Sequence, residues 1–132
     1  MSEPFDPALL PPLVLAYIGD AVFELEVRVL LVREGLAEPE RLHREAVTRV
    51  RAKAQSRVWQ GIVDRLAPDE AAVARRGRNA KVGRRPPGTT SQEYHESTAF
   101  EALLGYLYLS GRIERLQEII ALARILAGED ER

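Results

Sequence analysis

Apolar residues at helical spacing, interrupted by proline and glycine, are the feature that most constrains the fold of this chain. A long apolar pattern begins after Pro11 and Pro12, and Gly35 ends it. The alternation of apolar and polar residues that marks a strand is absent, so the chain is predicted to be all-α. In the first pattern the apolar residues recur three or four positions apart, as on a helix: Val14, Ile18, Ala21, Leu25, Val29 and Val32.

The remaining prolines and glycines predict five more helices. Pro39 suits the first turn of a helix, and Gly111 suits a C-terminal stop. With no domain linker in sight, the chain fits a single compact domain, 1–132. The helices are expected near residues 39–54, 55–66, 68–76, 92–110 and 112–127. The last helix is expected to face inward with Ile113, Leu116, Ile119, Ile120, Ala123 and Leu126.

Composition excludes several kinds of site. The chain has no cysteine and only two histidines, so disulfides, thiolate metal sites and a histidine-rich zinc site are not expected. Any metal site must use oxygen ligands, which favour Mg²⁺, Mn²⁺ or Ca²⁺. No apolar run is long enough to span a membrane, and the acidic start at 1–4 lacks the basic region of a signal peptide. We therefore expect a cytoplasmic protein with no membrane partner.

Cations are concentrated at residues 75–85. This basic segment contributes +6 to a chain of net charge −1, so the remaining residues carry −7. It runs into a loop rich in glycine and proline that is predicted at 77–91, and long loops inside compact domains are often functional. The segment either contacts phosphate groups or is a solvated loop, and charge alone favours neither. Its cations are Arg75, Arg76, Arg78, Lys81, Arg84 and Arg85.

Two acidic residues stand alone in apolar surroundings. Asp20 is the only charged residue within 13–23, and Glu101 is the only one within 97–111. Buried carboxylates need a partner, and one divalent cation could serve both. Other interpretations stay open, because Asp20 could cap a helix that begins after Gly19, and Glu101 could face solvent or pair with an arginine. Spacing along the chain cannot show that the two side chains meet.

Two segments around these acids resemble the ribonuclease III family. Residues 15–28 (LAYIGDAVFELEVR) resemble the helix in which a Gly-Asp pair supplies a catalytic aspartate. Residues 97–111 (STAFEALLGYLYLSG) resemble the family's second acidic helix, whose glutamate is a metal ligand. Asp20 and Glu101 match these two positions.

Within the family, the chain is most similar to the Mini-III branch. The GDAV-x-E pattern at 19–24, the AKAQ segment at 52–55 and the RRGRNAK block at 75–81 agree with that branch in order and spacing. Ribonuclease III enzymes usually carry four acids, but Ala16 and Thr98 stand at two of those positions here. The chain also leaves no room for a separate double-stranded-RNA-binding domain, so the catalytic domain is expected to hold RNA itself.

The resemblance implies an activity and an assembly. It implies a magnesium-dependent endoribonuclease that cleaves double-stranded RNA, leaves 5′-phosphate and 3′-hydroxyl ends, and accepts Mn²⁺ in place of Mg²⁺. It also implies a homodimer and a role in maturing the ends of precursor large-subunit (23S) ribosomal RNA. Asp20 and Glu101 would hold the cation together with waters and a phosphate oxygen. Tyr17 matches a position at the dimer contact, although an ordinary core aromatic is an equal alternative.

Further residues receive roles from this interpretation. Asn79 could reach a sugar or a base edge, and Glu24 and Gln55 could support the carboxylate pair. Gln55 and Lys53 are weaker candidates for RNA contact, and a structural role for Gln55 is the preferred alternative. Neither histidine, His43 or His95, is given a catalytic role because both are expected at the surface, and Trp59 is expected in the core. Contacts to RNA phosphates are assigned to Arg75, Arg76, Arg78, Lys81, Arg84 and Arg85.

Two rival functions remain at this point. The first is a non-catalytic protein of the same fold that binds structured RNA, which the loss of two acids would favour. The second is an all-helical protein-interaction module, which explains the apolar helices but neither the basic segment nor the isolated acids.

Overall fold

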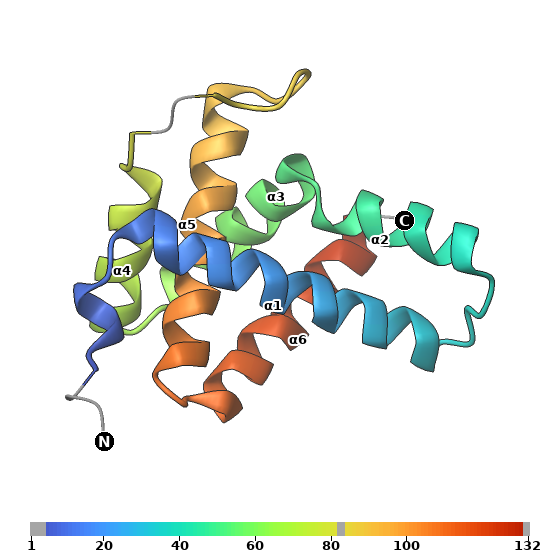
Figure 1. The fold of residues 1–132 in the computed structure, drawn as a ribbon, viewed down its shortest axis with the longest axis horizontal. Coiled ribbons are helices and arrows are strands. Elements are labelled where there is room, and N and C mark those ends of the chain that lie inside the picture. The colour runs from blue at the N-terminus through green and yellow to red at the C-terminus, as the bar shows by residue number, and fades with distance from the viewer. Residues whose placement is uncertain (1–4, 82–83, 131–132) are drawn as a thin grey trace.

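The computed structural model describes residues 5–81 and 84–130, and this part of the chain contains helices and no strand (Figure 1). The all-α prediction is therefore confirmed. Six α-helices follow one another: α1 (Pro12–Arg33), α2 (Pro39–Val50), α3 (Ala52–Ile62), α4 (Pro68–Arg78), α5 (Ser91–Leu109) and α6 (Ile113–Asp130). Short 3₁₀ turns lie at Pro7–Leu9 and Val63–Arg65.

Helix α5 is the centre of the fold. It packs against α1, α3, α4 and α6, which surround it in Figure 1. From Ala99 to Leu109 its residues are apolar apart from Glu101, as expected for a helix segment enclosed by others. At its start the Thr90 hydroxyl accepts from the Glu93 backbone N–H, and the Glu93 carboxylate accepts from the Thr90 N–H, each at 3.0 Å. This reciprocal cap fixes where α5 begins.

Helices α1 and α5 cross at a contact made by two glycines. A Cβ atom built on Gly19 would lie 1.7 Å from the backbone oxygen of Glu101. One built on Gly105 would lie 1.9 Å from the backbone oxygen of Leu15. Only glycine leaves space for two helix backbones at this separation. The crossing brings the turn that carries Asp20 against the turn that carries Glu101.

The buried face of α1 differs from the apolar stripe that the sequence pattern singled out. Val14, Leu25 and Val32 of that stripe are exposed. The helix is apolar on both sides, so periodicity could not tell which side faces the core. The face packed on the rest of the chain carries Leu15, Ala16, Gly19, Phe23, Val27 and Leu31.

Several predicted boundaries and burials also need correction. The second and third helices separate at Arg51, which has extended backbone angles, rather than near residue 54. Helix α4 continues to Arg78, two residues beyond the predicted end. Ile113 was expected to face inward but lies exposed in the first turn of α6. Trp59 is buried as predicted.

A buried acid ties α4 to the start of α6. Glu70 is fully buried and accepts from the guanidinium of Arg115 at 2.8 and 2.9 Å, and from Arg112 at 3.2 Å. It also accepts from the backbone N–H of Ala67 at 2.8 Å, which caps α4. Charge and hydrogen-bonding capacity are both satisfied, so this acid is structural.

Candidate active site

Asp20 and Glu101 meet where α1 crosses α5. The two carboxyl groups are hydrogen-bonded to one another, and Glu101 is largely buried while Asp20 is exposed. Asp20 lies in the middle of the continuous helix α1, so the interpretation of Asp20 as a helix cap is wrong. Glu101 faces another acid at this crossing. The interpretation of Glu101 as a solvent-facing residue is therefore wrong as well.

The electrostatics of Glu101 reflect this position. Burial, followed by the hydrogen bond and the negative charge of Asp20, raises the pKa of Glu101 to about 8, against a small opposing effect of the Gln55 amide. The raised pKa favours the protonated form of Glu101 at neutral pH. A cation between the two groups would oppose the raised pKa of Glu101 and favour the ionised form of both carboxyl groups.

A pH-dependent stability follows for the metal-free protein. The folded state holds the Glu101 proton more tightly than the unfolded chain, so stability falls as pH rises from about 4.5 to about 8. One pKa unit corresponds to about 1.4 kcal/mol. Glu101→Gln should therefore raise the free energy of unfolding by a few kcal/mol at pH 8 and by much less at pH 5. Urea denaturation in a chelating buffer at both pH values measures this, and an equal gain at both would contradict it.

Gln55 supports the pair from α3. Its side-chain Nε2 donates to Glu101 Oε2 at 3.3 Å and to the backbone oxygen of Val50 at 2.6 Å. The side chain is 2% exposed. The structure therefore places Gln55 beside Glu101, in keeping with its predicted supporting position. Three helices, α1, α3 and α5, contribute to the site.

Glu24 is not brought into this cluster. It forms an ion pair with Arg28 at 2.6 Å, one turn further along α1. Among the described side chains, 5–81 and 84–126, no group of three or more histidine, cysteine or acidic residues is placed to hold a metal ion. At the two positions where the wider family has acids, Ala16 is buried and the Thr98 hydroxyl donates to the backbone of Tyr94. The site is therefore a two-carboxylate site.

The basic segment is part helix and part loop. Arg75, Arg76 and Arg78 lie in the last turn of α4, where cations interact well with the helix dipole, although Arg78 was expected in the loop. Asn79 caps that helix through its backbone. The side chains of Arg75, Arg78, Lys81, Arg84 and Arg85 are exposed. Gly83, one of the predicted loop glycines, lies outside the described residues.

Arg76 has a structural contact that sequence reasoning missed. Its guanidinium donates to the backbone oxygens of Ala8 at 2.6 Å and Leu10 at 2.9 Å, which fastens the segment before α1 onto α4. No pattern in the sequence could have indicated a contact between residues so far apart in the chain.

The two histidines that were predicted to lie at the surface differ in their exposure. His43 is exposed as predicted, but His95 is half-buried and its Nδ1 has no hydrogen-bond partner among the described residues. His95 lines a polar hollow with Arg78, Asn79, Ser91 and Gln92, where the end of α4 approaches the start of α5. Two of the predicted RNA-contacting residues thus share one hollow.

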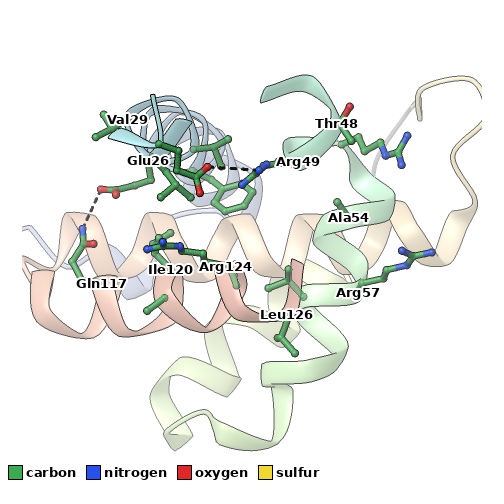
Figure 2. Close-up of a pocket in the computed structure, with 18 of the residues that line it drawn as sticks. Glu26, Val29, Thr48, Arg49, Ala54, Arg57, Gln117, Ile120, Arg124 and Leu126 are labelled. Carbon is green, nitrogen blue, oxygen red and sulfur yellow. Dashed lines mark hydrogen bonds and ion pairs between the residues drawn. The ribbon is translucent and has the colours of Figure 1, made fainter. Parts of the chain in front are cut away.

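A larger groove lies elsewhere on the molecule, between α1, α3 and α6 (Figure 2). Its volume is about 760 Å³, and its lining includes Lys53 but neither Asp20 nor Glu101. Val29, Ile120 and Leu126 are among its apolar lining residues, and Arg49 and Arg124 lie among its polar residues. The carboxylate pair, rather than this groove, marks the candidate active site because it holds the chemically unusual groups.

The donor set of the site fits a hard divalent cation. Two carboxylates and one amide oxygen are oxygen donors, which suit Mg²⁺. Facing carboxylates of this kind are stabilised in their ionised form by a positive charge between them. Asp20 and Glu101 are therefore the residues that could hold such a cation.

Comparison with known proteins identifies the family of the chain. The family profile described as Ribonuclease III domain matches residues 13–112. Mini-ribonuclease 3 of Brevibacillus brevis is 46% identical over 125 residues, which are 94% of this chain and 93% of that protein. Mini-ribonuclease 3 of Symbiobacterium thermophilum is 46% identical over 118 residues, 89% of this chain and 91% of that protein.

A solved structure shares the fold. A crystal structure of a protein from Fusobacterium nucleatum superimposes with a TM-score of 0.79 at 33% sequence identity, over 92% of this chain and 95% of that one. With the family profile, the similar sequences and the paired carboxylates in agreement, this chain belongs to the ribonuclease III family of endoribonucleases, in its Mini-III branch.

Proposed function

We propose that this protein is a magnesium-dependent endoribonuclease that cleaves double-stranded RNA in the cytoplasm, with Mn²⁺ able to replace Mg²⁺. The hydrogen-bonded pair of Asp20 and Glu101 carries the proposal, because two converging carboxylates are a means of holding one divalent cation. Its substrate would be the precursor of large-subunit (23S) ribosomal RNA. That target rests on the resemblance to the Mini-III branch alone.

Each residue of the site has a task in this reaction. When bound, Mg²⁺ would supply a Lewis acid for the scissile phosphate and would lower the pKa of an attacking water. Asp20 and Glu101 would hold the cation, and Gln55 would keep the Glu101 carboxylate in place through its Nε2. Cleavage would leave a 5′-phosphate and a 3′-hydroxyl end.

The basic segment would hold the duplex. RNA helices are recognised mainly through phosphates and 2′-hydroxyls, so exposed cations at the end of α4 and beyond it suit the task. Helix α5 joins the two parts of the proposed site, because its first turns line the hollow that contains Arg78 and Asn79 and its middle carries Glu101.

Neutralising Arg84 and Arg85 together should weaken duplex binding and flatten its salt dependence. Each lost phosphate contact lowers the slope of log K against log salt concentration by about one. Filter binding of a labelled RNA duplex between low and moderate salt measures the slope. The matched control is the double substitution of Arg33 and Arg124, two cations on the groove of Figure 2, which should keep it. A slope unchanged in the Arg84/Arg85 variant would contradict the assignment.

We further propose that two copies of the chain form the active enzyme. Support comes from α1, whose outer face is apolar although nothing in the described chain covers it. Tyr17 on that face is 79% exposed, so its interpretation as a core aromatic is wrong and a dimer contact would account for it. Sedimentation equilibrium should give about twice the 14.8 kDa mass of the chain. A monomer at micromolar concentration would exclude the dimer.

The test of the proposed activity is a cleavage assay on duplex RNA. Products are expected with Mg²⁺ or Mn²⁺ and none in the presence of a chelator. The same assay separates this function from a non-catalytic RNA-binding protein of the same fold. Binding of duplex without cleavage at any Mg²⁺ concentration would favour that rival and overturn the proposal.

A further inference from the structure

The side-chain oxygen of Gln55 is a buried acceptor without a donor. Gln55 is 2% exposed, and its Oε1 has no hydrogen-bond partner among the described residues. A buried amide oxygen left unpaired costs about 1–3 kcal/mol, so such atoms usually mark a function or a bound water or ion. By contrast, the buried hydroxyl of Ser56 on the same helix has a hydrogen-bond partner, because it donates to Glu96 at 2.7 Å.

The orientation of the Gln55 amide is fixed by its neighbours. Nε2 lies 2.6 Å from the backbone oxygen of Val50 and 3.3 Å from Glu101 Oε2, and both of these are acceptors. Turning the amide over would set Oε1 against two oxygens. The donor atom Nε2 is therefore bonded to two protein oxygens, and the acceptor atom Oε1 is the one without a hydrogen-bond partner among the described residues.

The open oxygen lies close to the carboxylate pair. Within one amide group, oxygen and nitrogen are about 2.3 Å apart. With Nε2 at 3.3 Å from Glu101 Oε2, Oε1 can be no further than about 5.6 Å from that carboxylate oxygen. Two hydrogen bonds of about 2.8 Å, with one water between them, span that distance. A hydrated cation held by Glu101 would bring such a water.

We propose that Gln55 is a positioning residue for the cation: Nε2 fixes the Glu101 carboxylate, and Oε1 accepts a hydrogen bond from a water that hydrates the ion. This inference rests on the proposed function and assigns to a neutral amide part of the work for which the wider family uses acids. A purely structural role for Gln55 would account for the position of Nε2, because its bond to Val50 satisfies a carbonyl at the end of α2. It would leave Oε1 unexplained.

The test is a calorimetric titration of the full-length, metal-free protein with Mn²⁺ in the absence of RNA. Gln55→Met keeps the shape of the side chain and removes both polar atoms. Loss of a group that orients a metal ligand typically weakens metal affinity 10–100-fold, and we expect a loss in that range. Gln60→Met on the same helix is the matched control, because Gln60 donates to Glu96 rather than to the pair, and it should keep the wild-type affinity.

A second variant addresses the open oxygen itself. Gln55→Glu loses the donor but keeps an acceptor at the Oε1 position, so it should bind Mn²⁺ more tightly than Gln55→Met. Equal affinity of these two variants would overturn the role of Oε1. Wild-type affinity in folded Gln55→Met, whatever its thermal stability, would overturn the whole inference and leave Gln55 a structural residue. If Gln55→Met does not fold, Gln55→Asn, whose amide is shortened by one methylene, takes its place with the same expectation.

Failure of the proposed function would look different. Asp20→Asn should abolish Mn²⁺ binding in the same titration. If wild type does not bind Mn²⁺, or if Asp20→Asn binds it equally well, the two-carboxylate site fails and the role of Gln55 fails with it. If wild type binds, Asp20→Asn does not, and Gln55→Met matches wild type, only the present inference fails.

Discussion

Asp20→Asn should reduce cleavage of duplex RNA on the order of 10³-fold or more. The substitution keeps the size of the side chain and removes one of two charges that would hold the cation. A cation contributes several kcal/mol of charge stabilisation in the transition state, and each 1.36 kcal/mol is a factor of about ten in rate. Single-turnover kinetics with excess enzyme at saturating Mg²⁺ measures the loss directly.

The loss should be confined to the chemical step. Asp20 is exposed and lies on a helix whose packing comes from its other face, so the variant should fold and bind duplex RNA at low salt at least as well as wild type. Glu26→Gln is the matched control on the same helix, since Glu26 accepts from Gln117 and belongs to a different contact. Its rate should stay within a few-fold of wild type. Cleavage by Asp20→Asn at a similar rate would remove Asp20 from the mechanism.

Gly19→Ala should damage both stability and activity. The new methyl group would lie 1.7 Å from the backbone oxygen of Glu101 and 2.9 Å from the backbone nitrogen of Gly105. Backbone atoms cannot rotate away, so α1 and α5 must separate. Overpacking of this kind costs about 1–3 kcal/mol and occasionally more. A displacement near 1 Å at a catalytic group can cost about 10²-fold in rate, so cleavage should fall by at least that factor even in the folded fraction.

Gly61→Ala provides the comparison. The three atoms nearest to its new Cβ all belong to the side chain of Leu126, with Cδ1 at 2.6 Å, and that side chain can rotate. Alanine also favours the interior of a helix over glycine by about 1 kcal/mol, which offsets the contact. Gly61→Ala should therefore unfold close to the wild-type midpoint in urea and keep its activity. Equal behaviour of the two variants would show that the α1–α5 crossing tolerates separation.

The sequence predicted the helices better than it predicted their packing. Proline and glycine mark chain breaks locally, so the six helices were expected within a few residues of their observed bounds. Which side of a helix faces inward depends on its neighbours. Helix α1 is apolar on both sides, and its pattern therefore pointed to Val14 and Leu25 although Leu15 and Phe23 are buried.

The candidate site was predictable only in part for the same reason. The isolation of Asp20 and Glu101 in apolar segments signalled unusual acids, but 81 positions separate them along the chain. Their meeting depends on the close crossing at Gly19 and Gly105. A glycine next to an acid inside an apolar helix is the local sign that could have indicated such a crossing.

Little in the sequence indicated the contacts that Gln55 and Arg76 make. Gln55 lies in a polar segment that gives no sign of burial, and its contact with Glu101 arises because α3 packs on α5. Arg76 resembled its basic neighbours in sequence, yet it donates to Ala8 and Leu10. Both contacts are set by the tertiary arrangement of the helices.

A crystal structure of the protein soaked in Mn²⁺, with the ion located by its anomalous scattering, tests the central claim most directly. The account predicts one ion with a carboxylate oxygen of Asp20 and one of Glu101 both in its first coordination shell, at about 2.0–2.2 Å. An ion bound elsewhere, or one that contacts only one of these two residues, would contradict it.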